Sequence, residues 1–189
     1  MIEPLTGTLD GRSNLVCISG EGSLLILLPE PLVSLWSGSL ALTSTTEKID
    51  RMKFRWAGEV SQPTDYDRAA DIRDSIAPLS VGEGEGIVIT EDYATVWLPS
   101  AEGGIFLRLT GSDEEVFPLM PLIEASMWSE PHFEYQVDQP NFVLFDPAFD
   151  YDTHLEYLEI STKPGRYEVS TFKQEIEGIR MLIYRLRAL

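Results

Sequence analysis

Few side chains in this sequence are of a kind, and at a separation, that would support catalysis or metal binding. Its two histidines, His132 and His154, have no further histidine or cysteine at a metal-ligand spacing. Cys17 is the single cysteine, so it can form no disulfide within the chain, and its apolar neighbours favour a small buried hydrophobe. The motifs G-x-S-x-G, H-E-x-x-H and C-x-x-C do not occur. We therefore expect no catalytic residue, no metal and no cofactor, and a protein that is not an enzyme.

Two stretches approach ligand-binding patterns but lack their essential residues. A calcium loop needs alternating ligands and a central glycine, which are missing around Asp146, Asp150, Asp152 and Glu156. Residues 81–86 are rich in glycine, but they precede a predicted strand and contain two glutamates, which would repel a phosphate. We interpret the carboxylates as turn and rim residues, and the glycine-rich stretch as a turn that enters a strand.

Asp65, Asp67 and Arg68 form the remaining cluster of interest. Paired carboxylates can act as general acid and base. However, these residues begin a predicted helix, where carboxylates cap the free N–H groups and an arginine forms an ion pair. We expect Asp65 to cap the helix, and Arg68 to pair with a carboxylate or a loop carbonyl.

Most of the predicted secondary-structure elements are short β-strands. They are rich in branched and aromatic residues, and Gly, Pro, Ser or Asp bounds most of them. Strands are predicted at 13–18, 23–28, 53–58, 86–90, 94–98, 104–109, 133–137, 141–145, 155–160, 166–172 and 179–187. The pattern predicts an α+β fold that is mostly antiparallel β with a few short helices.

Two segments carry helix signals. Residues 29–36 contain prolines near their start and are followed by a glycine, which predicts a short helix. The better helix is predicted at 65–76, since its apolar residues share one face and a proline follows its end. Thr64 or Asp65 can cap its start.

The two halves of the chain resemble each other faintly. Residues 23–29 and 141–147 both pass from an apolar strand to a proline. Two later strand pairs also match: 86–90 and 104–109 with 166–171 and 178–186. A decayed duplication explains these matches, and chance resemblance between short apolar strands explains them too. We expect two lobes of similar size: an N-terminal β-rich lobe at 1–118, and a C-terminal β-rich lobe at 119–189 packed on it.

Charge is distributed unevenly along the 189 residues. The formal net charge is −17. Residues 74–162 hold 18 Asp or Glu and one basic residue, Arg108, so this block alone accounts for the net charge. This excess of acidic over basic residues argues against nucleic-acid binding and against docking on an anionic membrane. A solubilising surface and a docking surface for a basic macromolecule both explain the block.

Turn-rich, acidic segments with aromatic neighbours mark where a partner would bind within this block. Loops project from a fold, and affinity comes from a few desolvated anchors. The predicted partner-binding residues are Asp113, Glu114, Glu115, Trp128, Glu130, Glu134, Asp138, Asp150, Tyr151 and Asp152.

Several short motifs follow one another along the chain. They are LILLP at 25–29, LWSG at 35–38, DYDRA at 65–69, GIVIT at 86–90, TVWLP at 95–99, GGIFLRL at 103–109, LFD at 144–146 and PGRYEV at 164–169. In this order and spacing, the chain resembles the Immunity protein 21 family of bacterial polymorphic-toxin systems over most of its length. The resemblance implies a protein that neutralises a toxin made by the same cell. Among the matched positions we expect a chiefly architectural role for Trp36, Gly38, Asp65, Tyr66, Asp67, Arg68 and Trp97.

The sequence therefore predicts an immunity protein that binds and blocks a cognate toxin, which we expect to be basic. We expect it in the cytoplasm, because the start has no signal peptide and the longest apolar run, Leu24–Leu28, is too short for a membrane span. The alternative is an adaptor or secretion chaperone for a toxin or effector, which would recognise a secretion or targeting segment and release its client intact. A hydrolase that uses Asp65, Asp67 or the region of His154 is a third reading.

Overall fold

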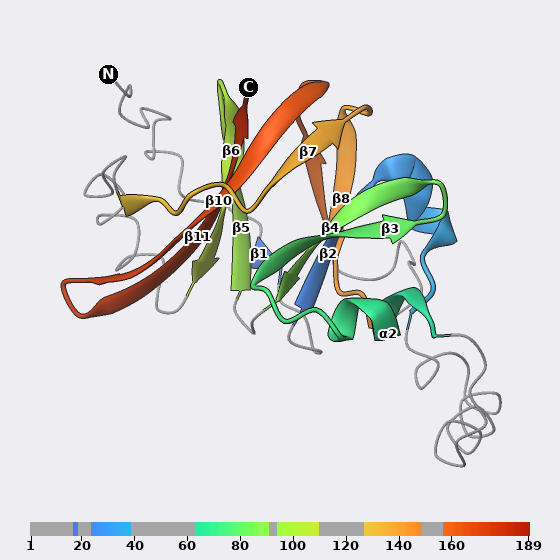
Figure 1. Cartoon of the computed structure of the whole chain (residues 1–189), viewed down its shortest axis with the longest axis horizontal. Coiled ribbons are helices and arrows are strands. Elements are labelled where there is room, and N and C mark those ends of the chain that lie inside the picture. Colours follow the sequence, from blue (N-terminus) through green and yellow to red (C-terminus); the bar gives the residue numbers. More distant parts are fainter. Residues whose placement is uncertain (1–16, 19–23, 39–62, 91–93, 110–126, 149–156) are drawn as a thin grey trace, which may run out of the picture. The chain divides into compact units, whose positions relative to one another are not determined.

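The computed structural model describes residues 17–18, 24–38, 63–90, 94–109, 127–148 and 157–189. Strands dominate these residues, and two short helices accompany them (Figure 1). The strands are β1 (Cys17–Ile18), β2 (Leu24–Pro29), β3 (Ile76–Val81), β4 (Gly84–Thr90), β5 (Ala94–Ser100), β6 (Gly103–Leu109), β7 (Phe133–Val137), β8 (Asn141–Phe145), β9 (Tyr157–Ser161), β10 (Gly165–Ile176) and β11 (Ile179–Ala188). The helices are the 3-10 helix η2 (Glu30–Leu35) and the α-helix α2 (Asp65–Ala70).

The strands form two sheets. The first sheet has the order β1-β5-β6-β11-β10-β7, and the second sheet has the order β3-β4-β2-β8-β9. The strand pairs with a defined register are all antiparallel. The predicted fold class, mostly antiparallel β with a few short helices, is therefore confirmed for the described residues.

The chain divides into two compact units, and each contains one sheet. The first unit comprises Met1–Ile18, Tyr93–Pro140 and Ser161–Leu189, and the second comprises Ser19–Asp92 and Asn141–Ile160. This division differs from the contiguous lobes expected at 1–118 and 119–189. The difference arises because strands from the two halves of the chain hydrogen-bond to each other, as β6 does with β11 and β2 does with β8.

Each sheet has its own apolar side chains. In the first unit a cluster of five buried residues on β6, β10 and β11 includes Phe172, Met181 and Ile183, and Trp128 packs against it. In the second unit the central strand β2, which pairs with β4 and β8 along its two edges, is buried along most of its length. The continuous apolar run at 24–28 fits that central position.

The helix predicted at 65–76 is wrong in its second half. α2 ends at Ala70, and Ile76 begins β3. Ile76 is buried at 2% exposure and pairs with Ile89 of β4. Pairing with β4 therefore outweighs the helical spacing of the apolar residues, and it recruits a strand that the sequence analysis did not predict.

Most of the other predicted elements are confirmed. The short helix expected at 29–36 is η2, and the glycine-rich stretch contains the turn between β3 and β4 and the start of β4. The hairpin of β5 and β6 has the expected location, with longer strands. The strand predicted at 53–58, and residues 13–16 and 155–156 of two others, lie outside the described residues. None of the described helices has the length and apolar character that a membrane crossing needs.

Candidate functional site

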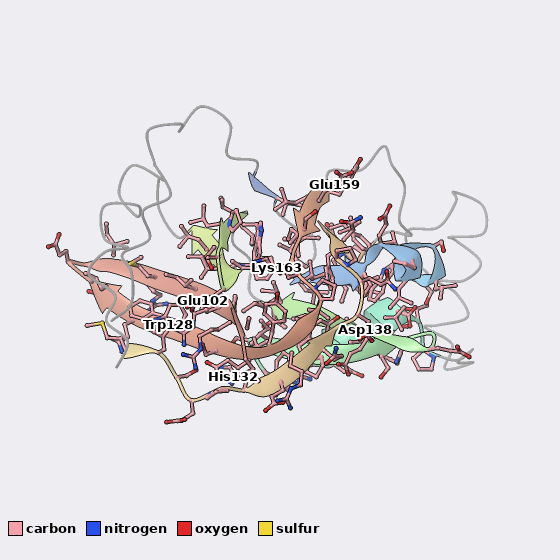
Figure 2. The ribbon with its side chains drawn as sticks, turned by 90° about the horizontal axis from the view of Figure 1, so that it is seen from above. Glu102, Trp128, His132, Asp138, Glu159 and Lys163 are labelled. Carbon is pink, nitrogen blue, oxygen red and sulfur yellow. The ribbon has the colours of Figure 1, made fainter. Side chains whose placement is uncertain are left out.

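Four of the predicted partner-binding residues lie among the described residues, and all four occur in or beside β7, at one end of the first sheet. Trp128 and Glu130 precede this strand, Glu134 belongs to it, and Asp138 follows it. Figure 2 shows Trp128, His132 and Asp138 following one another along this rim. The other six lie outside the described residues: Asp113, Glu114, Glu115, Asp150, Tyr151 and Asp152.

We call β7 with Glu130, Glu134 and Asp138 the acidic edge. β7 pairs with β10 and is the last strand in the order of the first sheet. Tyr135 and Val137 are buried at 2% and 1% exposure. Because side chains alternate along a strand, burial of these two residues leaves Glu134 exposed on the other face. The buried side chains of Tyr135 and Val137 therefore fix the backbone of β7, so that the Glu134 carboxylate faces away from the core.

The segment before β7 is also bonded to β10. The N–H of Ser129 donates to the carbonyl of Thr171 at 2.9 Å, and the N–H of Thr171 donates to Ser129 Oγ at 3.0 Å. The N–H of His132 donates to the carbonyl of Val169 at 2.8 Å, and His132 Nε2 lies 2.8 Å from Thr171 Oγ1. These bonds fix the course of the chain from Ser129 to His132, and so they position Glu130.

The acidic edge has little opposing charge of its own. Residues 127–140 contain three carboxylates and no lysine or arginine. Glu134 lies 3.6 Å from Arg166, but both side chains are more than 60% exposed. An ion pair this exposed contributes at most about 1 kcal/mol. Asp138 accepts a hydrogen bond from Gln136 Nε2 at 3.0 Å. The carboxylates are therefore available to a cationic partner.

Trp128 precedes the acidic edge in the chain, and its ring makes a cation–π contact with Arg185. The guanidinium carbon of Arg185 lies 4.2 Å from the centroid of the Trp128 ring, and the ring of Phe172 lies 6.0 Å away at a tilt. Arg185 Nε donates to Ser170 Oγ at 3.2 Å. Contacts of this kind limit the rotamers of Trp128, which is half-buried. A rigid aromatic group next to exposed charge is a suitable anchor for a protein partner.

Glu168 forms ion pairs with Arg187 and with Arg185, the arginine that contacts Trp128. Its carboxylate lies 2.8 Å from Arg187 Nη2 and 3.8 Å from Arg185 Nη2. Burial and the neighbouring Arg187 lower the pKa of Arg185, whereas the hydrogen bond to Glu168 raises the pKa of Arg187. Sequence reasoning missed this cluster. The available signal was alternation: Glu168 and Ser170 stand two apart in one predicted strand, as Arg185 and Arg187 do in the next.

The motif residues of the second unit form a structural network. Trp36 is buried, donates through Nε1 to the carbonyl of Pro147 at 3.0 Å, and meets Phe145 edge-on. Gly38 is buried, and the N–H of Tyr66 donates to the carbonyl of Ser37 at 3.1 Å.

Asp65 does not cap α2, contrary to our expectation. The N-cap is Thr64, whose hydroxyl accepts from the N–H of Asp67 while the Asp67 carboxylate accepts from the N–H of Thr64. Asp65 instead accepts from the N–H and the hydroxyl of Ser37, at 2.9 Å each, and pairs with Arg68. Thr64 occupies the N-cap position, from which its hydroxyl reaches the N–H of Asp67. The carboxylate of Asp65 is directed instead toward Ser37, in the segment after η2.

Trp97 packs against glycine in the first unit. Its ring lies 4.6 Å from that of Phe106, centroid to centroid. A β-carbon built on Gly104 would lie 2.3 Å from two ring carbons of Trp97. The ring therefore needs a glycine beneath it, which gives a physical reason for the pair of motifs TVWLP and GGIFLRL.

No candidate metal centre forms in the part of the chain that the structure describes. No three histidine, cysteine or carboxylate side chains group there as metal ligands. Asp146 accepts from the N–H of Ala148 at 2.9 Å, which is the turn role expected for it. The hydroxyl nearest to His132 is that of Thr171, at 2.8 Å from Nε2, and the Ser129 hydroxyl, at 3.5 Å, donates to the carbonyl of Glu130 at 2.8 Å.

Comparisons with known proteins identify no relative. No family model matches the chain, and neither a curated protein nor a solved structure matches it significantly. The chain's own residues and the resemblance of its motifs are therefore the basis for assigning its function.

Proposed function

We propose that this chain is an immunity protein that binds a cognate bacterial toxin and neutralises it by stoichiometric inhibition in the cytoplasm of the producing cell. The toxin is basic, and the acidic edge receives it. Charge on the edge guides the encounter, and Trp128 provides an anchor that keeps the partner bound.

The acidic edge is the observation that carries this proposal. Carboxylates that repel one another destabilise a free protein, so a concentration of them is costly unless a partner neutralises it. Glu134 is exposed on β7, which is held firmly by its buried residues, and Glu130 and Asp138 are exposed just before and just after this strand. A rigid surface loses little entropy when it binds.

The placement of the motif residues also supports the proposal. The residues that carry the resemblance to the Immunity protein 21 family, such as Trp36, Asp65 and Trp97, make packing and hydrogen-bond contacts within their units. Residues that maintain a fold would be shared across a family whose members bind different toxins, whereas the contact surface would vary. This arrangement leaves the acidic edge to determine which toxin is bound.

Co-expression tests the proposal directly. The protein encoded by the gene immediately upstream is expressed from an inducible promoter, with and without this chain. We expect growth to be rescued, and the purified complex to lack toxin activity. A complex that retains toxin activity identifies an adaptor or chaperone instead, and a failure to rescue contradicts the immunity function.

Neutralising the acidic edge should slow toxin binding. We expect the variant Glu130→Gln, Glu134→Gln, Asp138→Asn to associate about 10-fold more slowly at low salt, with a weaker dependence on ionic strength, because electrostatic steering is lost. Stopped-flow or biolayer measurements across a salt series provide the rates. Melting temperatures should not fall.

A matched variant controls for net charge. Asp74→Asn, Glu83→Gln, Glu159→Gln changes the charge by the same amount at exposed positions outside the acidic edge. We expect this control to associate nearly at the parent rate. Equal slowing in both variants would show that the charge of the whole chain, and not the acidic edge, governs association.

We also propose that the chain arose by duplication. The first sheet reads as β1-β5-β6 followed by β11-β10-β7, and the second as β4-β2 followed by β8-β9, with β3 added at one end. Pairing the halves in chain order, β1, β2, β4, β5 and β6 correspond to β7, β8, β9, β10 and β11. This order supports two of the sequence matches, 23–29 with 141–147 and 104–109 with 178–186. It does not support the third match, of 86–90 with 166–171. These residues belong to β4 and β10, and β10 corresponds in position to β5.

A further inference from the structure

The end strands of the two sheets differ in length, in charge and in the backbone groups with which an added strand could pair. In the second sheet, β3 contains Pro78, which has no N–H, and its Ser80 carbonyl accepts from Arg68 Nη2 at 2.9 Å. β9, at the other end, has a single carboxylate, Glu159. In the first sheet, the described part of β1 has two residues. β7 has five residues and no proline, and no described strand pairs with its outer side.

The hydrogen bonds of β10 establish which residues of β10 face β7. Thr171 uses both its N–H and its carbonyl toward Ser129, and Val169 accepts from His132. In an antiparallel ladder, alternate residues turn their backbone groups to the same side. Thr171, Val169 and, by alternation, Tyr167 therefore turn theirs toward β7.

The register then assigns the outward groups of β7. Val169 is opposite Phe133, and Tyr167 is opposite Tyr135. Phe133 and Tyr135 therefore use their backbone groups toward β10, and the residues between and after them, Glu134 and Gln136, turn their N–H and carbonyl groups to the open side. An extended chain beside β7 would find two donors and two acceptors in ladder geometry.

Charge determines which chain fits. Glu134 and Asp138 are four residues apart, which is about 13 Å along a strand. A strand paired with β7 has the same repeat, so lysines or arginines at alternate positions would lie near these carboxylates. A second copy of this chain, with net charge −17, would instead bring like charges together.

We propose that the open side of β7 is a strand-addition site for an extended, basic segment of the partner. Main-chain hydrogen bonds to Glu134 and Gln136 provide the docking, and the carboxylates select for basic side chains. That the segment belongs to a toxin rests on the proposed function. The strand-addition site itself can be tested without the toxin.

The test uses the full-length protein and a capped peptide of about eight alternating lysine and valine residues, a length that covers an edge strand. Amide hydrogen exchange is measured by NMR at low salt, with and without the peptide. We expect exchange at the Glu134 and Gln136 amides to slow about 10-fold, because the peptide occupies these donors. Exchange at Tyr135 should not change, and a peptide with glutamate in place of lysine should have no effect.

A pair of variants isolates the main-chain contribution. Gln136→Pro removes one outward donor, which an edge strand tolerates, and Gln136→Ala removes only the side chain. We expect Gln136→Ala to bind the peptide like the parent, and Gln136→Pro to bind it at least about 10-fold more weakly, since a donor is lost and the proline ring obstructs the incoming strand. Equal melting temperatures would show that both variants are folded.

The outcomes separate the two proposals. Absent binding, or binding without slower exchange at Glu134 and Gln136, overturns strand addition, and this measurement on the parent does not depend on the proline variant folding. Parent-like binding by Gln136→Pro also overturns it. If exchange slows but co-expression gives no rescue, strand addition stands and the immunity function fails. Rescue without slower exchange gives the reverse conclusion.

Discussion

Asp65 connects three segments of the second unit through one carboxylate. It accepts two hydrogen bonds from Ser37 and pairs with Arg68, and Arg68 in turn donates to the carbonyl of Ser80. The side chain of Asp65 is 14% exposed, whereas that of Arg68 is 40% exposed. Water can therefore replace the contacts of Arg68 more readily than those of Asp65.

We predict that Asp65→Ala destabilises the protein more than Arg68→Ala does. Loss of the Asp65 carboxylate leaves the Ser37 donors without their acceptor and should lower the free energy of unfolding by about 2 kcal/mol. Arg68→Ala should lower it by about 1 kcal/mol, because the Ser80 carbonyl lies at an exposed position.

Urea unfolding of both variants provides these free energies. The reverse order would show that the ion pair, and not the Ser37 contact, dominates. If Arg68→Ala keeps the parent stability and abolishes toxin binding, the architectural assignment of the motif residues is wrong and they form the binding site.

At the scale of elements, the β10–β11 hairpin has a strained turn. Ile176 pairs with Ile179 across a two-residue loop, in which Glu177 has φ 51° and Gly178 has φ 84°. Positive φ at both loop positions is the geometry of a type I′ turn, which glycine and asparagine adopt readily. A glutamate there has a β-carbon in an unfavourable position.

We predict that Glu177→Asn stabilises the protein by about 0.5–1 kcal/mol, since asparagine tolerates the left-handed region. Glu177→Gln is the matched control: it removes the same charge and keeps the unfavourable backbone preference. Thermal or urea unfolding of the two variants separates the effects. Equal stabilisation by both would mean that relief of charge repulsion, and not backbone strain, is the cause.

Over the whole chain, each sheet combines strands from both halves, which meet in the middle of the sheet. β6 and β11 are neighbours in the first sheet, and β2 and β8 are neighbours in the second. A fragment of either half would expose strands whose partners lie in the other half. The two halves should therefore depend on each other for folding.

We predict that fragments 1–118 and 119–189 do not fold separately but reassemble when they are co-expressed. Co-purification through a tag on one fragment, with a circular dichroism spectrum like that of the intact chain, measures the reassembly. A cooperative unfolding transition of 119–189 alone would contradict this expectation, and would support the contiguous division into lobes at residue 118.

Features that depend on near neighbours along the chain could be predicted from the residues alone. Strand-forming residues between turn residues predicted most of the strands, and the glycines of residues 81–86 marked a turn. The acidic character of residues 127–140 could also be read directly, because it is a matter of composition. Local sterics and turn chemistry are encoded within a few residues, which is why these predictions succeed.

Features that depend on partners far apart along the chain could not be predicted in this way. Ile76 begins a strand because β4 lies beside it, although its spacing from Ala69 fits a helix. Trp128 meets Arg185, 57 positions along the chain, because the register of β10 with β11 places that arginine near it. Likewise, no described strand pairs with the outer side of β7, because β7 is last in the order of its sheet. Strand order arises from long-range hydrogen bonding and burial, which leave no signal within a single strand.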